Sequence, residues 1–307
     1  MATPVADHGR VVKATSLRLK AYILAADSTW ISASVLSYYD LVEEIIVSYD
    51  GRSRGWTGAP IPVEECLVRL RALDPGGKMR FCPGDYFRPG HTPMENDAFQ
   101  RRCALAAAGA GADWVLQIDS DEVLPNKQAL LKAMQYAEEN GIPAVEWPMR
   151  VLFRQLAGSQ FLEVCAENGE DHFEYPGPIV VRPDAVPVDA RRTSGPFLRP
   201  VIAGDHSSLQ LRQGVAPGEV RATLLQDTDA ILHYSWARSP SAVRTKVASW
   251  GHHQGWRSWL FYVRYWAPAP WIWRHMRDFH PFARGLWPAL KVSHRVPALS
   301  VDRTRRN

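Results

Sequence analysis

The sequence predicts an α/β fold in which a mostly parallel sheet is flanked by helices. Residues 17–150 alternate short apolar runs with longer amphipathic segments, which is the pattern of repeated βα units. The apolar run 114–118 also ends on two closely spaced carboxylates, Asp119 and Asp121. Open parallel sheets bind their ligands at the carboxyl ends of such strands.

Four βα units are expected in the first half of the chain. Strands are predicted over 19–25, 44–49, 78–82 and 114–118, and helices over 30–39, 63–73, 94–108 and 127–140. Asp27 and Ser28 are N-cap residue types before the first helix, and Gly141 is a typical stop after the last. Beyond Pro143, strands are predicted over 144–153 and 178–181, and a helical pattern returns from Pro240.

The net charge of +4 hides two parts of opposite sign. Residues 237–307 hold 13 basic and two acidic residues, whereas the first 236 hold 23 basic and 30 acidic residues, so the parts carry +11 and −7. The basic tail also holds seven of the twelve tryptophans. We therefore predict one α/β domain over 15–236, with halves at about 15–125 and 140–236, and a helical, aromatic- and Arg-rich extension over 237–307.

Composition and missing motifs exclude several classes of protein. No apolar run approaches the roughly 20 residues that span a bilayer, and residues 1–10 lack the apolar core of a secretory signal. Four irregularly spaced cysteines argue against a zinc cluster or a disulfide scaffold. No dinucleotide fingerprint, phosphate-binding loop or nucleophile elbow is present, and no nucleic-acid recognition motif appears. We expect a cytoplasmic protein without a nucleic-acid partner.

The Asp119-x-Asp121 pair is the strongest chemical signal in the chain. Two carboxylates leaving one strand can share a hard divalent cation, Mn²⁺ or Mg²⁺, which would then neutralise a diphosphate. His233 follows the apolar pair Ile231-Leu232, so it is also expected at a strand end. The alternatives are a solvated acidic turn for the pair and a core histidine for His233.

Three segments carry a resemblance to a known family. They are the strand-Asp27-helix-strand segment ending in VSYDGRS, the helix NDAFQRRCALAAA followed by DWVLQIDSDEVL, and the late segment ILHYSW followed by an Arg- and Lys-containing helix with Lys246. In this order they resemble the family 2 glycosyltransferases, in particular a subgroup similar to lipopolysaccharide-core glucosyltransferases. Arg102 stands where that subgroup has Asn. The resemblance covers residues 17–125 well, 140–235 loosely and the tail hardly at all.

The resemblance implies a GT-A fold and a set of donor contacts. It assigns Asp50 to the nucleobase, Asp27 to the nucleoside, Asp119 to the ribose or the metal, and Asp121 to the metal. Many GT-A enzymes add a late histidine to the metal site, which would be His233 here. A carboxylate accepts the N–H of a uracil, so a UDP-sugar is favoured as donor. Arg101 is either a cation near the diphosphate or an exposed helix arginine.

An inverting transfer needs a carboxylate that deprotonates the acceptor hydroxyl. The first candidate is Asp205 in IAGDHSS, because a strand ending in Arg precedes it as in the subgroup. The second is Asp171, beside Glu170 in ENGEDHFEYPG. A retaining mechanism stays open because the base is not fixed by the sequence.

The leading hypothesis is a metal-dependent hexosyltransferase that moves a sugar to a glycan, lipid-linked or small-molecule hydroxyl. A catalytically inactive GT-A module that binds glycans or anionic surfaces is the alternative, and a metal-dependent nucleotidyltransferase is a third. The aromatic and basic residues of 250–287 predict a peripheral contact with the inner face of the membrane. Alternatively, those aromatics pack on the catalytic domain or stack on acceptor sugars.

Overall fold

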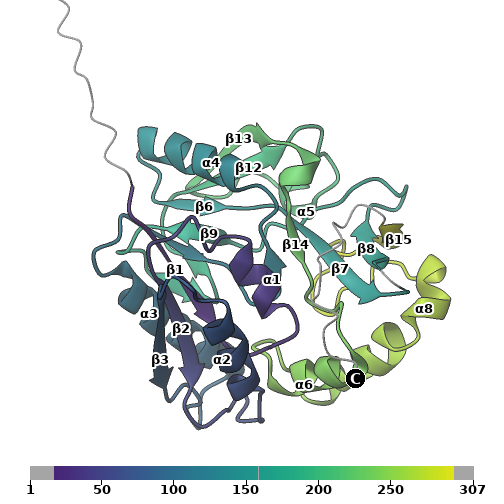
Figure 1. Cartoon of the computed structure of the whole chain (residues 1–307). Helices are drawn as coiled ribbons and strands as arrows, with labels where there is room; N and C mark the ends of the chain where they lie inside the picture. The colour runs from purple at the N-terminus through teal and green to yellow at the C-terminus, as the bar shows by residue number, and fades with distance from the viewer. Residues whose placement is uncertain (1–16, 158, 294–307) are drawn as a thin grey trace, which may run out of the picture.

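The computed structural model describes residues 17–157 and 159–293, and it confirms the predicted α/β class (Figure 1). A large sheet with the strand order β13-β12-β6-β9-β4-β1-β2-β3 lies at its centre. All of these strands run in one direction except β9, which pairs antiparallel with β4 and β6. The sheet is therefore mostly parallel, as predicted.

The predicted βα units of the first half are present. Their elements are β1 (Leu19–Leu24), α1 (Ile31–Leu36), β2 (Ile45–Asp50), α2 (Val63–Ala72), β3 (Met79–Gly84), α3 (Pro93–Gly109), β4 (Trp114–Gln117), β5 (Glu122–Val123) and α4 (Lys127–Glu139). Helix α1 is shorter than predicted and starts after Trp30 without a side-chain cap. Asp27 does not cap it, because its carboxylate accepts the Thr29 N–H and pairs with Arg238.

Helices cover both faces of the sheet because its strands are apolar on both sides. On one face Ala21 and Ile23 of β1 pack with α1, α2 and α4. On the other face Tyr22 and Leu24 pack with Ala104 and other residues of α3. The two-residue alternation of a strand thus gives each layer of helices its own core.

The strand predicted over 144–153 is in fact two strands that belong to different sheets. β6 (Ala144–Glu146) joins the large sheet, whereas β7 (Met149–Gln155) joins a smaller one with the order β15-β8-β7-β14-β5. Pro148 lies between them and has no N–H to continue a strand ladder. The other elements up to residue 233 are β8 (Phe161–Cys165), β9 (Pro178–Val181), β10 (Pro187–Asp189), β11 (Arg192–Thr193), β12 (Phe197–Ile202), α5 (Leu209–Arg212), β13 (Glu219–Leu225), the 3₁₀ turn η1 (Asp227–Asp229) and β14 (Ile231–His233).

The C-terminal segment completes the smaller sheet and its core. It comprises α6 (Pro240–Ser249), α7 (Trp256–Phe261), the π-helical turn η2 (Tyr262–Trp266), α8 (Ala269–Ile272), the 3₁₀ turn η3 (Trp273–His275) and β15 (Ala289–Ser293). Phe261, Trp266 and Trp287 are buried against Phe153 and Val164 of β7 and β8. In Figure 1 this segment lies beside β7 and β8. The rest of the predicted extension, 294–307, and residues 15–16 lie outside the described residues. Within the described chain, no helix is both long and apolar enough to cross a bilayer.

Candidate active site

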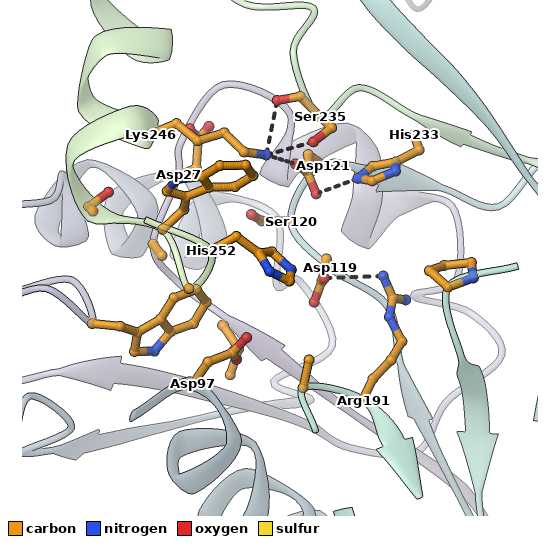
Figure 2. A pocket seen from close by; sticks show the side chains of 18 of the residues that line it. Asp27, Asp97, Asp119, Ser120, Asp121, Arg191, His233, Ser235, Lys246 and His252 are labelled. Atoms are coloured by element: carbon orange, nitrogen blue, oxygen red, sulfur yellow. Dashed lines mark hydrogen bonds and ion pairs between the residues drawn. The ribbon is translucent and has the colours of Figure 1, made fainter. Parts of the chain in front are cut away.

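A cavity of about 560 Å³ is lined by residues at the carboxyl ends of β1, β2 and β4, and Figure 2 shows part of this lining. Its volume is within the roughly 300–1,000 Å³ range of small-molecule sites. In the large sheet β4 lies on the opposite side of β1 from β2, so the chain reverses its winding there and a crevice opens. The predicted residues that line the cavity are Asp27, Asp50, Arg101, Asp119, Asp121 and His233.

Two arginines hold Asp119. The Nη1 and Nη2 atoms of Arg101 lie 2.9 and 3.1 Å from its two carboxylate oxygens, and Arg191 Nη2 lies 3.2 Å from Oδ2. Arg101 also donates from Nε to Asp97 at 2.7 Å. Burial disfavours the charged form of Asp119, but the two guanidinium groups outweigh it and lower its pKa. Arg101 is thus a buried arginine whose donors go to carboxylates, rather than an exposed helix residue.

Asp121 is held by two cations from the predicted extension, 237–307. Its Oδ2 accepts from Arg238 and from Lys246 Nζ, which lies 3.2 Å away. Arg238 also pairs with Asp27, so one guanidinium joins the ends of β1 and β4. Burial raises the pKa of Asp121, but Lys246 and Arg238 reverse the effect and hold it well below its usual range. Figure 2 shows Lys246 reaching Asp121 from one side of the site and Arg191 reaching Asp119 from the other.

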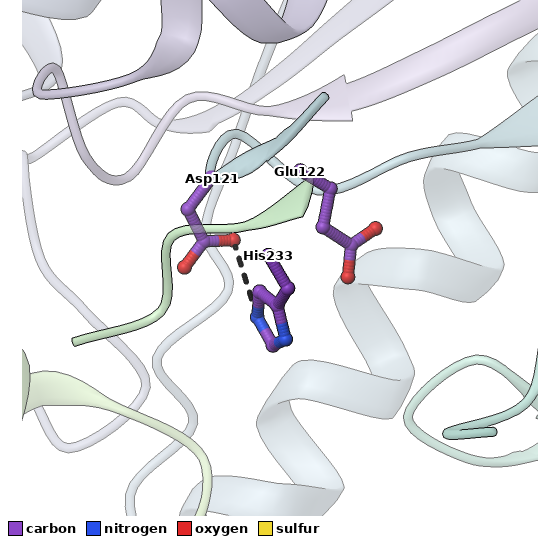
Figure 3. Close-up of side chains that lie close together, drawn as sticks. All are labelled: Asp121, Glu122 and His233. Carbon is purple, nitrogen blue, oxygen red and sulfur yellow. Dashed lines mark ion pairs between the residues drawn. The ribbon is translucent and has the colours of Figure 1, made fainter. Parts of the chain in front are cut away.

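Asp121, Glu122 and His233 form a group that could hold a metal ion (Figure 3). Each offers a ligand atom, and these atoms lie within 4.8 Å of one another. Strand pairing explains the geometry, because His233 of β14 stands opposite Glu122 of β5. His233 Nε2 lies 3.8 Å from Asp121 Oδ1, and His233 Nδ1 is buried without a hydrogen-bond partner. Two carboxylates and a neutral imidazole suit a divalent cation.

Asp119 stands apart from that group although it was predicted as a metal ligand. Its carboxylate faces Arg101 and Arg191, and its backbone N–H donates to Glu122 Oε2 at 3.1 Å. Arg191 spans Asp119 and Glu122 from the β10–β11 turn. The group that could hold an ion therefore includes Glu122, which the sequence did not single out, and not Asp119.

Asp50 lies at the end of β2 and is 2% exposed. One of its oxygens accepts the backbone N–H groups of Arg52 and Arg54, and the other accepts that of Tyr86 at 3.0 Å. Burial alone would raise the pKa of Asp50, but these N–H groups lower it. The carboxylate thus fixes the loop that lines this end of the cavity.

The two predicted bases do not line the cavity. Asp205 accepts the backbone N–H groups of Ser207 and Ser208, both at 3.1 Å, and the Ser208 hydroxyl at 2.6 Å. Asp171 pairs with Arg150 at 2.7 Å and with Lys291. Both carboxylates are engaged in local structure outside the residues that line the cavity.

Glu174 and Asp189 are the acids of the second half that line the cavity, and Glu174 is the buried one of the two. It is 8% exposed, and it accepts a hydrogen bond from the indole Nε1 of Trp287. Its backbone pairs with Met149, with N···O distances of 2.8 and 3.0 Å. Burial raises the pKa of Glu174 to about 7. The segment ENGEDHFEYPG contains it, but nothing in the sequence marked it over its neighbours.

Arg101 was predicted as a site residue, but Arg191, Arg238 and Lys246 were not, although the helix with Lys246 was part of the family resemblance. Arg238 and Lys246 belong to the predicted extension, and Arg191 belongs to a short hairpin with no periodic signal. A basic residue just before the Ser239 N-cap and another on the following helix were the available clues for Arg238 and Lys246. No local pattern pointed to Arg191.

Comparisons with known proteins give no family for this chain. No family model matches it, and no curated protein matches its sequence. Among solved structures, 4-diphosphocytidyl-2C-methyl-D-erythritol synthase from Anaerococcus prevotii is similar over 54% of this chain and 70% of its own, with 12% identity and a TM-score of 0.31. Mannose-1-phosphate geranyltransferase from Thermus thermophilus is similar over 55% and 51%, with 13% identity and a TM-score of 0.28. These values identify neither a family nor an activity.

Proposed function

We propose that the protein is a metal-dependent glycosyltransferase that uses a nucleotide-diphospho-sugar, with a UDP-sugar favoured. The observation that carries the proposal is one cavity that joins the Asp119-x-Asp121 pair to the buried carboxyl group of Glu174. The pair lies at the winding reversal of a parallel sheet, where such folds bind nucleotides. The acceptor is proposed to be a hydroxyl of a glycan, a lipid-linked sugar or a small molecule.

The donor nucleoside is proposed to lie between Asp27 and Asp50, at the ends of β1 and β2. Oδ1 of Asp50 accepts from Arg52 and from the backbone and side chain of Arg54, whereas Oδ2 accepts from the Tyr86 N–H and keeps a lone pair for the N–H of a uracil. Asp27 would accept from a nucleoside hydroxyl. Both side chains line the same cavity as Asp121, so a donor bound there would direct its diphosphate towards the cations.

Arg238 and Lys246 are the proposed partners of the diphosphate. Arg238 is 6% exposed and its Nε is buried without a partner, and Lys246 reaches the centre of the site. Arginine and lysine both suit phosphate oxygens. In this proposal Arg101 acts indirectly, because its contacts with Asp97 and Asp119 hold the Asp119 carboxylate in place.

The donor atoms of the site fit a divalent cation. Asp121 Oδ1 and His233 would hold it, with Glu122 as a further carboxylate and Asp119 as a neighbour. The unpartnered ring nitrogen of His233 is consistent with a ligand that the protein itself does not supply. When bound, such an ion supplies positive charge that stabilises the leaving nucleoside diphosphate.

Glu174 is proposed as the general base of an inverting transfer. Its carboxylate takes the proton of the acceptor hydroxyl as that oxygen attacks the anomeric carbon. The new glycosidic bond forms as the bond from the anomeric carbon to the diphosphate oxygen breaks, and the diphosphate leaves with the electron pair. Arg238 and Lys246 then face the developing charge on the leaving group.

Three carboxylate variants test the proposal against its alternatives. Glu174→Gln should lower kcat by about 10²–10⁴-fold with the affinity for nucleoside diphosphate unchanged, whereas Asp205→Asn and Asp171→Asn should keep most activity per folded molecule. A large loss for Asp205→Asn alone would reassign the base.

Activity is screened against a panel of nucleotide-sugars with Mn²⁺, and NMR determines the anomeric configuration of the product. Retention of configuration would exclude the inverting mechanism, and turnover of free nucleoside triphosphate would indicate a nucleotidyltransferase.

A further inference from the structure

The C-terminal segment presents two apolar faces, and among the described residues, 17–157 and 159–293, other parts of the protein cover one of them. Phe261 and Trp266 point into the core shared with β7 and β8. Trp256, Trp259, Leu260 and Val263 follow the helical spacing i, i+3, i+4 and i+7, and all four are exposed. Trp271 of α8 is also exposed. We call these five residues the aromatic surface.

The exposure of this surface is unusual for such large side chains. Trp256, Val263 and Trp271 are 69%, 64% and 81% exposed. Single exposed apolar residues are normal, but a helical stripe of them marks an interaction site. Trp271 lies on α8, further along the same basic stretch of the chain.

The charges around the aromatic surface indicate what covers it. From residue 240 to residue 277 the chain has no acid and five basic residues besides Lys246, which lies in the candidate active site. Arg257, Arg264 and Arg274 are exposed and stand 6.0, 5.7 and 4.4 Å from the ring centres of neighbouring aromatics. A protein partner would need a dense acidic face, whereas an anionic lipid bilayer supplies both negative charge and an apolar layer beneath it.

We propose that the aromatic surface binds peripherally to an anionic lipid membrane. The tryptophans would lie at the headgroup level, which suits their apolar rings and polar N–H, and the arginines would contact lipid phosphates. The chain between the cavity and this surface is short. His252 lines the cavity, and Trp256 follows four residues later, so about 14 Å at most separates their Cα atoms. The cavity would therefore stand close to the membrane, within reach of a lipid-linked acceptor.

This inference does not depend on the proposed transfer reaction, because binding is measured without turnover. The full chain is floated with vesicles of phosphatidylcholine alone and of phosphatidylcholine mixed with phosphatidylglycerol. It should float with the mixed vesicles, and its tryptophan fluorescence should shift to shorter wavelength. Absence of flotation with the mixed vesicles would overturn the proposal.

Two sets of substitutions separate the apolar contribution from the charged one. Trp256→Ser/Val263→Ser/Trp271→Ser should weaken binding at least about tenfold, since it removes the apolar area that enters the interface. Arg257→Gln/Arg264→Gln/Arg274→Gln should weaken it about a hundredfold, because each basic residue near an anionic surface contributes about a factor of five. The matched control is Val68→Ser/Val215→Ser, which removes valines that are 57% and 62% exposed elsewhere, and it should bind like the parent protein.

Folding and self-association are checked on the same samples. Circular dichroism and thermal melting should agree between the variants and the parent, so that a loss of flotation reports the surface itself. Sedimentation at several concentrations should give one constant mass. A mass that rises with concentration and falls back in the tryptophan variant would show that a second copy covers the surface, and would overturn the membrane proposal.

Discussion

Lys246 Nζ lies 3.2 Å from Asp121 Oδ2, although 125 positions separate the two residues in the chain. The same ammonium group contacts the Ser235 carbonyl and hydroxyl at 3.0 and 2.8 Å. Helix α6 thus extends a cation from the basic C-terminal segment into the site of the acidic first half. The acidic residues 1–236 and the basic residues 237–307 therefore contact each other through an ion pair at the candidate active site.

Replacing Lys246 with Met should lower kcat/KM for the nucleotide-sugar by about 10²-fold, because one cation that faces the leaving diphosphate is lost. Arg238 remains beside Asp121, so the fold should be retained at a cost of about 1–3 kcal/mol. Steady-state kinetics and chemical unfolding measure the two effects. Lys246→Arg is the matched control and should restore much of the activity. Equal kinetics for Lys246→Met and the parent protein would remove Lys246 from the mechanism.

The dependence of kcat/KM on pH should show the titration of Glu174. A general base acts in its deprotonated form, and burial raises the pKa of Glu174 to about 7. kcat/KM should therefore fall as the pH decreases through about 7, and it should level off above that value. Glu174→Gln should remove this limb from whatever activity remains.

Trp287 lowers the pKa of the Glu174 carboxyl group. Its indole N–H donates to the Glu174 carboxylate and favours the charged form, which lowers the pKa against the effect of burial. Trp287→Phe keeps an aromatic ring but loses the donor, so the acidic limb should move to higher pH. Trp266→Phe is a useful control, because its indole donates to the Trp236 carbonyl at 2.9 Å instead. An unmoved limb in Trp287→Phe would indicate that another group titrates.

Metal binding should depend on Asp121 and His233. Asp121→Asn and His233→Ala should each weaken Mn²⁺ binding by at least about 10–100-fold, the range typical of losses around metal sites. Electron paramagnetic resonance of free Mn²⁺ measures affinity directly, without a donor. His252→Ala is the control, since His252 lines the cavity outside the group that could hold the ion. A chelator should abolish turnover, and full activity in its presence would contradict the metal proposal.

The sequence predicted the elements whose signals are local. Strand periods, turn residues and helix stops placed the βα units to within a few residues, and they put Asp27, Asp50 and Asp119 at strand ends. The sequence did not predict that β6 and β7 separate at Pro148, because the apolar pattern continues through this residue. The two strands differ in their partners, since β6 pairs with β12 and β7 pairs with β14. Strands β12 and β13 were also missed, since pairing with distant segments stabilises them.

Glu174, the proposed base, shows why site residues are harder to predict from the sequence than helices and strands. Asp171 and Glu174 lie three positions apart in the chain, but Glu174 lines the cavity and Asp171 does not. Met149 pairs with the backbone of Glu174, and Trp287 lies 113 positions away. The aromatic tail poses a similar problem. Both faces of α7 are apolar, so its sequence could not indicate that Phe261 is buried and Trp256 exposed.

A buried ion cluster away from the cavity should govern stability. Arg199 of β12 contacts Glu146 through Nε and lies 2.6 Å from Glu219 through Nη1. Burial raises the pKa of Glu146 to about 7. Arg199→Met leaves this carboxylate buried without its cation, so the free energy of unfolding should drop by about 3–5 kcal/mol at alkaline pH.

The pH dependence of that loss identifies its cause. A carboxyl group with a raised pKa binds its proton more tightly in the native state, so its effect on stability is favourable at low pH and is lost as the pH rises through about 7. The Arg199→Met penalty should therefore be smaller in acid, where Glu146 is protonated, than in mild alkali. Urea unfolding at both pH values measures it, and Arg199→Met/Glu146→Gln should recover part of the stability. Equal losses at both pH values would point to packing rather than charge, because the methionine differs from arginine in shape as well.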